Sequence, residues 1–124
     1  MNMTELQAKV IQFRDERDWA QYHNPKDLAI SLSLEAAELL EVFQWKNLTE
    51  VDALKSDFDS QQRVKEELGD IFIYALTLAH EFSLDPTQIV LDKIETNEKK
   101  YPVEKVKGKS DKYTAYSSES RESD

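Results

Sequence analysis

The sequence predicts an all-α protein of the four-helix-bundle type. Only 2 Gly and 3 Pro occur among 124 residues, which is too few for a turn-rich β fold. Apolar residues make up 40% of the chain and recur at helical spacing, so they can supply one hydrophobic core. We therefore expect four main helices and one short connecting helix.

Start and stop signals define the first two helices. A capping-box pattern that begins at Thr4 predicts a helix from there to about Tyr22. Asn24 followed by Pro25 is typical of a cap and the first helical position, and it predicts a second helix that runs to about Lys46.

The remaining helices are marked in the same way. Thr49, with an acid three residues later, has the form of a cap for the short connecting helix. Apolar spacing predicts a third long helix over about 60–82. Asp85 and Pro86 repeat the signal of a cap followed by proline, and they open a fourth helix that ends near Lys100.

After Pro102 the composition changes. Lysines cluster around Gly108, and serines then alternate with acidic residues to the end of the sequence. Such a segment has little apolar surface to bury. We expect a helical catalytic domain over 1–102 and a polar, flexible tail over 103–124, with roughly the last dozen residues disordered.

Composition excludes several classes of function. There is no Cys, which excludes disulfide scaffolds, thiolate zinc sites and cysteine nucleophiles. The net charge is −9, and apart from the scattered lysines near the end of the sequence there is no group of basic residues, which argues against binding to DNA or RNA. No apolar run is long enough to span a membrane, and Met1–Glu5 does not begin a secretory signal, so we expect a cytoplasmic protein.

Two pairs of acidic residues stand out on the two long central helices. Glu35 and Glu38, like Glu67 and Asp70, are spaced i, i+3, which places each pair on one helical face. The residues between them are apolar or small, whereas a solvated face normally carries Lys or Arg.

Each acid pair borders a predicted apolar row. The rows are Leu28, Leu32, Ala36, Leu39 and Phe43 on the second helix and Val64, Leu68, Ile71, Ala75, Leu78 and Phe82 on the third. If these rows pack together, four carboxylates meet in a partly buried seam and repel one another unless they protonate or bind cations. Oxygen ligands of this kind suit Mg²⁺ or Mn²⁺. The alternative is that they are acids at the edge of the core, paired with lysines.

A di-iron centre is a poor fit. Such centres in helical bundles need Glu-x-x-His on two helices, and neither His23 nor His80 has a Glu three residues before it.

The acidic pattern resembles a known signature. Glu35-x-x-Glu38 followed, after 28 residues, by Glu67-x-x-Asp70 resembles the MazG-like superfamily of all-α nucleoside triphosphate pyrophosphohydrolases. The segments FRDERDW, FQWK and TN, with Tyr74, resemble its dCTP pyrophosphatase-like branch. The resemblance extends over about 6–102.

This resemblance implies an enzyme that converts a (deoxy)NTP, with dCTP or modified dCTP expected first, into a monophosphate and pyrophosphate. It implies Mg²⁺, or alternatively Mn²⁺, held by all four acids of the signature. It also implies a homo-oligomer, commonly a tetramer built as a dimer of dimers. The residues implied to contact the nucleotide are Trp19, His23, Trp45 and Tyr74 around the base, and Asn97 nearby.

Several assignments stay open at this level. One of the four acids, or Glu41 one turn beyond Glu38, could orient the attacking water. The candidate phosphate contacts are Lys26, Lys46, Lys93 and Lys100, although a solvated lysine is the more common reading of each. The alternatives are a related dUTP or phosphoribosyl-ATP pyrophosphohydrolase, or a non-catalytic helical interaction module. No membrane or nucleic-acid polymer is expected as a partner.

Overall fold

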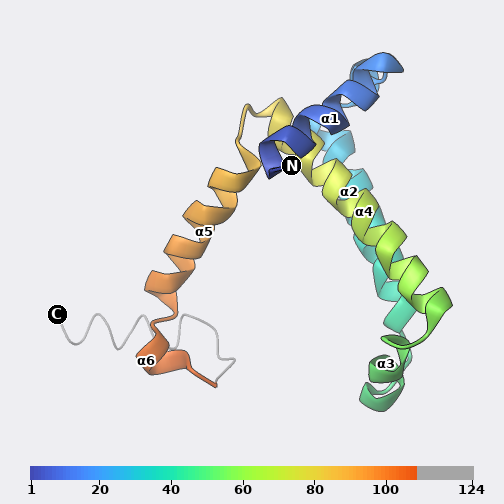
Figure 1. Cartoon of the computed structure of the whole chain (residues 1–124), viewed down its shortest axis with the longest axis vertical. Coiled ribbons are helices and arrows are strands. Elements are labelled where there is room, and N and C mark those ends of the chain that lie inside the picture. The colour runs from blue at the N-terminus through green and yellow to red at the C-terminus, as the bar shows by residue number, and fades with distance from the viewer. Residues whose placement is uncertain (109–124) are drawn as a thin grey trace. The chain divides into compact units, whose positions relative to one another are not determined.

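The structure, a computed structural model, describes residues 1–108, and within that range it contains helices and no strand (Figure 1). The predicted all-α class is confirmed. The elements are α1 (Met3–Glu16), the 3₁₀ helix η1 (Ala20–Tyr22), α2 (Pro25–Phe43), α3 (Leu48–Leu54), α4 (Phe58–Glu81), α5 (Pro86–Lys100) and α6 (Val103–Val106).

The chain forms two units. The first, Met1–Pro86, holds α1 to α4, and the second begins at Thr87 and holds nearly all of α5 together with α6. The predicted domain boundary after Pro102 falls inside the second unit and stays a prediction. The short helix α6 lies in the segment predicted as a tail, whereas the last dozen residues lie outside the described part of the chain.

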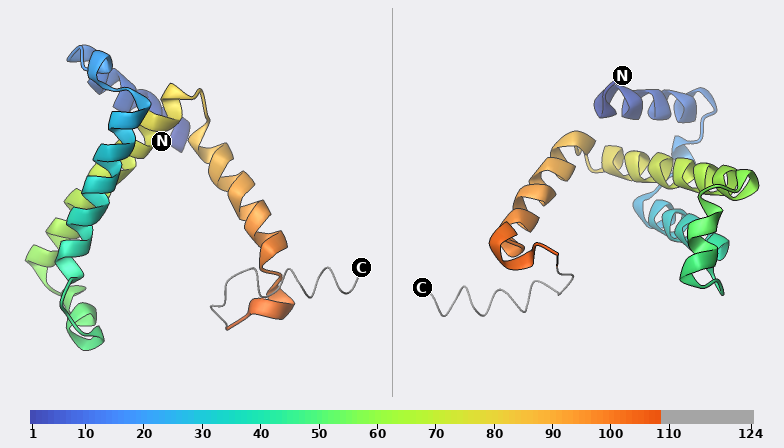
Figure 2. Two further views of the ribbon diagram at one scale, coloured as in Figure 1. Left: turned by 180° about the vertical axis from the view of Figure 1, so that it is seen from behind. Right: turned by 60° about the horizontal axis from the view of Figure 1, so that its bottom comes forward.

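An antiparallel helical hairpin dominates the first unit. α2 and α4 lie side by side along their lengths, with α3 at the end where the chain passes from one to the other (Figures 1 and 2). Leu28 and Val42 of α2 are buried, as are Leu76 and Ala79 of α4. The short connection through α3 explains why two consecutive long helices pack as neighbours.

Polar contacts attach α1 to the C-terminal end of α4. The side chain of Arg14 is buried, and its Nη1 donates to Glu81 Oε1 at 2.8 Å. Gln7 Nε2 donates to the carbonyl oxygen of Leu76 at 3.1 Å. Ile11 is the buried apolar residue of α1. A buried guanidinium is tolerated here because it is paired.

Local capping explains where the helices begin, and two caps differ from those predicted. Asn24 caps α2 and Pro25 is its first residue, as predicted. The cap of α1 is Asn2 and not Thr4, and the cap of α3 is Asn47 rather than Thr49. In both cases an Asn two residues earlier accepts a hydrogen bond from the amide three residues on, and the helix begins there.

The first two helices end earlier than predicted. α1 ends at Glu16, because Asp18 adopts a positive φ of 56° that a right-handed helix cannot continue through. α2 ends at Phe43, and Trp45 has a φ of 68°. The first break lies next to Trp19, and the second occurs at Trp45 itself.

Much apolar surface of the hairpin remains exposed. Four members of the predicted apolar rows are exposed instead of buried, namely Ala36, Leu68, Ala75 and Phe82. Other large exposed apolar side chains on the two helices are Ile30, Leu34, Leu40, Phe72 and Ile73. Two helices packed as a single layer bury only the strips that face each other, which explains the exposure. Across residues 1–108, no helix has the length and apolarity needed to cross a membrane.

Candidate active site

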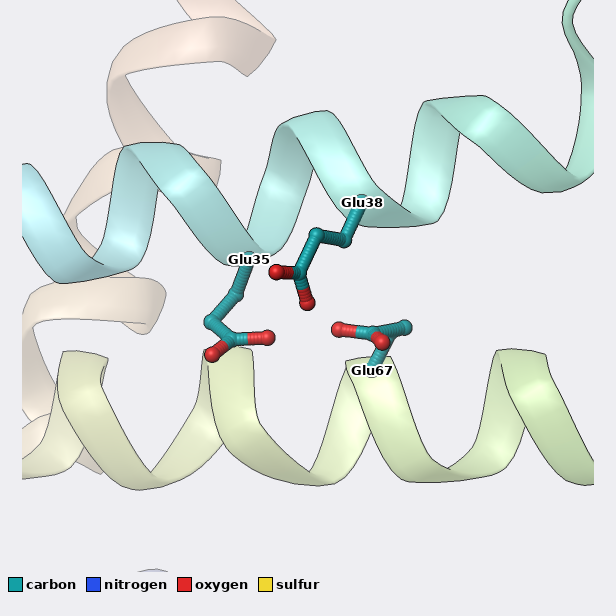
Figure 3. Close-up of side chains that lie close together, drawn as sticks. All are labelled: Glu35, Glu38 and Glu67. Atoms are coloured by element: carbon teal, nitrogen blue, oxygen red, sulfur yellow. The ribbon is translucent and has the colours of Figure 1, made fainter.

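Three carboxylates meet between α2 and α4. Glu35 and Glu38 project from α2 toward Glu67 on α4, as Figure 3 shows. One carboxylate oxygen from each residue lies within 4.8 Å of those of the other two. Glu35 and Glu67 are half-buried, and Glu38 is exposed. Three of the four predicted metal ligands are therefore brought together; we call them the acidic cluster.

The helical periodicity explains why Glu35 is in the seam. It lies seven residues after the buried Leu28 and seven before the buried Val42, which places all three on one face of α2. Glu67 likewise lies between the half-buried Val64 and Ile71 of α4. The acids are thus part of the packed faces, whereas the sequence analysis placed them beside those faces.

The cluster perturbs the acidity of Glu35. Hydrogen bonding with the Glu67 carboxyl, followed by partial burial and by the hydrogen bond and charge of Glu38, raises the pKa of Glu35 from 4.5 to about 7. The physical cause is that a second and third negative charge disfavour ionisation in a partly desolvated seam. In the absence of a compensating cation, Glu35 therefore holds its proton more tightly than an isolated glutamate does.

The donor set fits a divalent cation. Glu67 Oε2 is buried and has no hydrogen-bond partner within the described residues. No ion pair with Lys or Arg in residues 1–108 involves the acidic cluster, which leaves the lysine-paired alternative without support in this range. Clustered carboxylate oxygens are the ligands that Mg²⁺ and Mn²⁺ prefer, and the unpartnered Glu67 Oε2 is free to bind one.

The two other predicted catalytic acids lie outside the cluster. Asp70 is exposed on α4, one turn after Glu67, and Glu41 is exposed on α2, one turn after Glu38. Their roles as a fourth ligand and as a residue that orients water stay predictions.

The two tryptophans predicted for the base pocket flank α2. Trp19 precedes the helix and is 44% exposed, and Trp45 follows it and is 92% exposed. A helix of 19 residues, the length of α2, is about 28 Å long. A single base is too small to contact both rings of one chain across that length.

His23 and Tyr74 lie on different parts of the first unit. His23 connects η1 to α2, and its Nδ1 is buried without a hydrogen-bond partner in the described residues. Tyr74 is half-buried on α4, two turns beyond Glu67 on the same face. The contact of either side chain with a nucleotide stays a prediction.

The predicted phosphate contacts are divided between the units. Lys26 and Lys46 are exposed at the two ends of α2. Asn97, Lys93 and Lys100 lie on α5, in the second unit, and their contact with a nucleotide stays a prediction.

Two features of the first unit were missed by the sequence analysis. The guanidinium of Arg17 stacks on the ring of Phe13, although their i, i+4 spacing could have indicated the contact. A cavity of about 370 Å³ lies under α3, lined mainly by apolar residues that include Phe43, Leu54 and Val64. No sequence pattern indicates that cavity, because it depends on how α3 folds back.

Comparison with known proteins identifies the family to which this fold and site belong. The sequence pattern of the MazG-like family matches residues 30–115, which include the whole acidic cluster. The chain therefore belongs to the MazG-like family, as its acidic signature predicts.

Among curated proteins, the chain is similar to dCTP pyrophosphatase 1 of several mammals. It is 40% identical to the protein of Mus musculus over 103 residues and 37% identical to that of Homo sapiens over 105 residues. Both matches cover 83% of this chain and 61% of the relative, so the chain spans about three fifths of the length of these proteins.

A solved structure supports the fold at similar identity. A crystal structure described as a pyrophosphatase from Archaeoglobus fulgidus is 43% identical and superimposes with a TM-score of 0.72. The match covers 81% of this chain and 92% of the other.

Proposed function

We propose that the protein is a nucleoside triphosphate pyrophosphohydrolase that depends on a divalent cation, with dCTP or a modified dCTP as substrate. The products are the nucleoside monophosphate and pyrophosphate. The observation that carries the proposal is the acidic cluster, with its unpaired buried oxygen on Glu67. Support comes from relatives named as dCTP pyrophosphatases. The corresponding role is removal of surplus or modified nucleotides in the cytoplasm.

Charge explains why the cluster suits this reaction. A triphosphate is a polyanion, and a protein with a net charge of −9 needs cations to hold it. Mg²⁺ or Mn²⁺, when bound, supplies positive charge against the phosphate oxygens and stabilises the charge that builds up as the leaving group departs.

The residues of the chain hold and orient the reactants. The cation would be held by Glu35, Glu38 and Glu67, with Asp70 as the proposed fourth ligand, and Glu35 would have to be ionised to bind it. Hydrolysis at the α-phosphorus forms a bond from the water oxygen and breaks the bond to the bridging oxygen, so that pyrophosphate leaves. Glu41 or one acid of the cluster orients the water and accepts its proton.

The base pocket is proposed to be built by two copies of the chain. Trp19 and Trp45 lie beyond opposite ends of α2, so a second copy is needed to bring two such rings to one base. Exposed apolar residues on the hairpin, among them Leu34 and Phe72, offer a surface for that copy. We propose a homo-oligomer, with a tetramer of paired dimers as the expected form.

The deciding experiment measures pyrophosphate release from a panel of nucleotides with and without Mg²⁺. The panel contains dCTP, 5-methyl-dCTP, dUTP and phosphoribosyl-ATP. We expect pyrophosphate release from dCTP and 5-methyl-dCTP in the presence of Mg²⁺, and we expect a chelator to abolish it. If the protein prefers dUTP or phosphoribosyl-ATP, that nucleotide takes the place of dCTP as the proposed substrate. If no nucleotide yields pyrophosphate, a non-catalytic interaction module is favoured.

A further inference from the structure

Three side chains stack at the C-terminal end of α1. The central guanidinium carbon of Arg17 lies 3.7 Å from the centre of the Phe13 ring. The Phe13 ring in turn meets Trp19 edge to face, with ring centres 5.9 Å apart and planes at 73°. We call this set the Arg17 stack. Phe13 is 50% exposed and Trp19 is 44% exposed, so the stack lies at the surface and is no part of the core.

The backbone of this turn returns Trp19 to the end of α1. Asp18 adopts the left-handed conformation with φ of 56°, which reverses the chain. The amide of Trp19 then donates to the carbonyl oxygen of Arg14 at 3.1 Å, and that of Asp18 donates to Asp15 at 3.0 Å. The main chain of Trp19 is therefore fixed, and the orientation of its ring depends on what the ring contacts.

Arg17 is held in place by Phe13. Its Nη1 donates to the carbonyl oxygen of Phe13 at 2.9 Å while the guanidinium plane covers the ring. The ion pair of Arg17 with Glu16 is long, at 3.9 Å, and both side chains are exposed, so that pair contributes little. The favourable contacts of Arg17 are thus with the ring and carbonyl of Phe13.

We infer that Arg17 is a positioning residue for nucleotide binding: by clamping Phe13, it holds the Trp19 ring in the orientation that stacks on the base. This inference rests on the proposed function, which assigns Trp19 to the base pocket. A preset ring loses less conformational freedom when the base binds, so the clamp increases affinity and leaves the chemical step unchanged. Loss of the clamp then raises KM and leaves kcat unchanged.

The kinetic test compares Arg17→Met, Phe13→Leu and the double variant with dCTP as substrate. Each single change is expected to raise KM about three- to ten-fold, the range of one cation–π or aromatic contact, with kcat within about two-fold of wild type. The double variant is expected to equal the larger single effect, because both changes break one chain of contacts. Lys9→Met, which removes an exposed cation from the same helix, is the matched control and should leave KM unchanged.

The second experiment monitors Trp19 directly by its fluorescence and does not depend on enzymatic activity. The sequence has 2 Trp, so Trp45→Phe leaves Trp19 as the one fluorescent indole. In that background, Arg17→Met is expected to increase quenching of Trp19 by acrylamide and to lower its anisotropy, whereas Lys9→Met should change neither.

Three outcomes would overturn the inference. In the first, Arg17→Met leaves both KM and Trp19 quenching at their wild-type values. In the second, Arg17→Met raises KM while Phe13→Leu does not, which would mean that Arg17 contacts a phosphate directly. In the third, kcat falls and KM is unchanged. If wild-type protein cleaves no nucleotide, the proposed function fails, and the fluorescence arm still decides whether Arg17 holds Trp19.

Discussion

At the scale of single residues, the proposed chemistry rests on carboxylates whose negative charges repel one another. Glu35 and Glu67 bring carboxylate oxygens together in the half-buried seam, and the exposed Glu38 completes the cluster. Such an arrangement is unfavourable on electrostatic grounds unless a proton or a cation is bound, which gives the cluster a measurable signature in both activity and stability.

Neutralising a ligand tests the catalytic role of these acids. Glu38→Gln and Asp70→Asn are each expected to lower kcat by at least about 10²-fold, because each removes a negative charge from the proposed cation site. Initial rates of pyrophosphate release at saturating dCTP measure the effect. Glu66→Gln, which neutralises an exposed acid next to Glu67, is the control and should stay near wild type. If Glu38→Gln and Asp70→Asn both keep near wild-type turnover, these acids do not bind a catalytic metal ion.

The raised pKa of Glu35 gives a stability effect of known sign. The folded pKa of about 7 exceeds the ordinary value of 4.5, so the folded state binds this proton more tightly. The resulting stabilisation is fully present below pH 4.5 and is lost as pH rises through about 7. Glu35→Gln mimics the protonated form and should lack this pH dependence.

Urea unfolding in chelator at pH 5 and pH 8 measures the effect. Wild type should lose free energy of unfolding relative to Glu35→Gln between the two pH values. Parallel pH dependence in the two proteins would contradict the raised pKa.

At the scale of elements, one partly buried ion pair joins α1 to the end of α4. Arg14 is 7% exposed and donates to Glu81, whose side chain is partly accessible. Arg14→Met is expected to lower the free energy of unfolding by about 2–4 kcal/mol, because it leaves Glu81 without its partner. Urea unfolding of Arg14→Met and of a control variant, Lys55→Met, measures the effect. Lys55→Met breaks the exposed pair with Asp52 and should cost less than about 1 kcal/mol. Equal losses in the two variants would show that burial of Arg14 is unimportant.

The sequence predicted the elements where local chemistry decides them. Asn24 and Pro25 identify the start of α2, because a side-chain cap and a fixed φ act within a few residues. The early ends of α1 and α2 were missed, because Asp18 and Trp45 adopt positive φ that is uncommon for residues other than Gly. Those two breaks also set where both tryptophans lie.

The acidic cluster was predicted in part. The i, i+3 spacing within apolar stretches identified Glu35, Glu38 and Glu67. Asp70 has the same spacing from Glu67 and yet lies outside the cluster, because where a side chain lies depends on how the two helices cross as well as on spacing. The spacing of residues along one helix does not predict the angle at which two helices cross.

At the scale of the whole molecule, exposed apolar surface is the observation behind the proposed oligomer. The hairpin leaves Leu34 and Phe72 exposed on its outer faces, and α5 likewise exposes Leu91 and Ile94. Light scattering at micromolar concentration is expected to give a mass well above 14.4 kDa. Leu34→Glu should shift the mass toward the monomer and lower activity with it, whereas Glu66→Gln should do neither. A wild-type monomer would refute the shared base pocket.

The central claim is that the acidic cluster holds a divalent cation in the folded protein, and a thermal melt tests it most directly. A cation that binds the folded site and not the unfolded chain stabilises by about 2.7 kcal/mol at a concentration 100-fold above its dissociation constant. For a domain of this size, Mg²⁺ should raise Tm by about 5–15 °C at neutral pH. The shift should shrink toward pH 4, where protons compete for the same oxygens. It should vanish in the Glu35→Gln/Glu38→Gln double variant, and an equal shift in wild type and that variant would place the cation elsewhere and contradict the account.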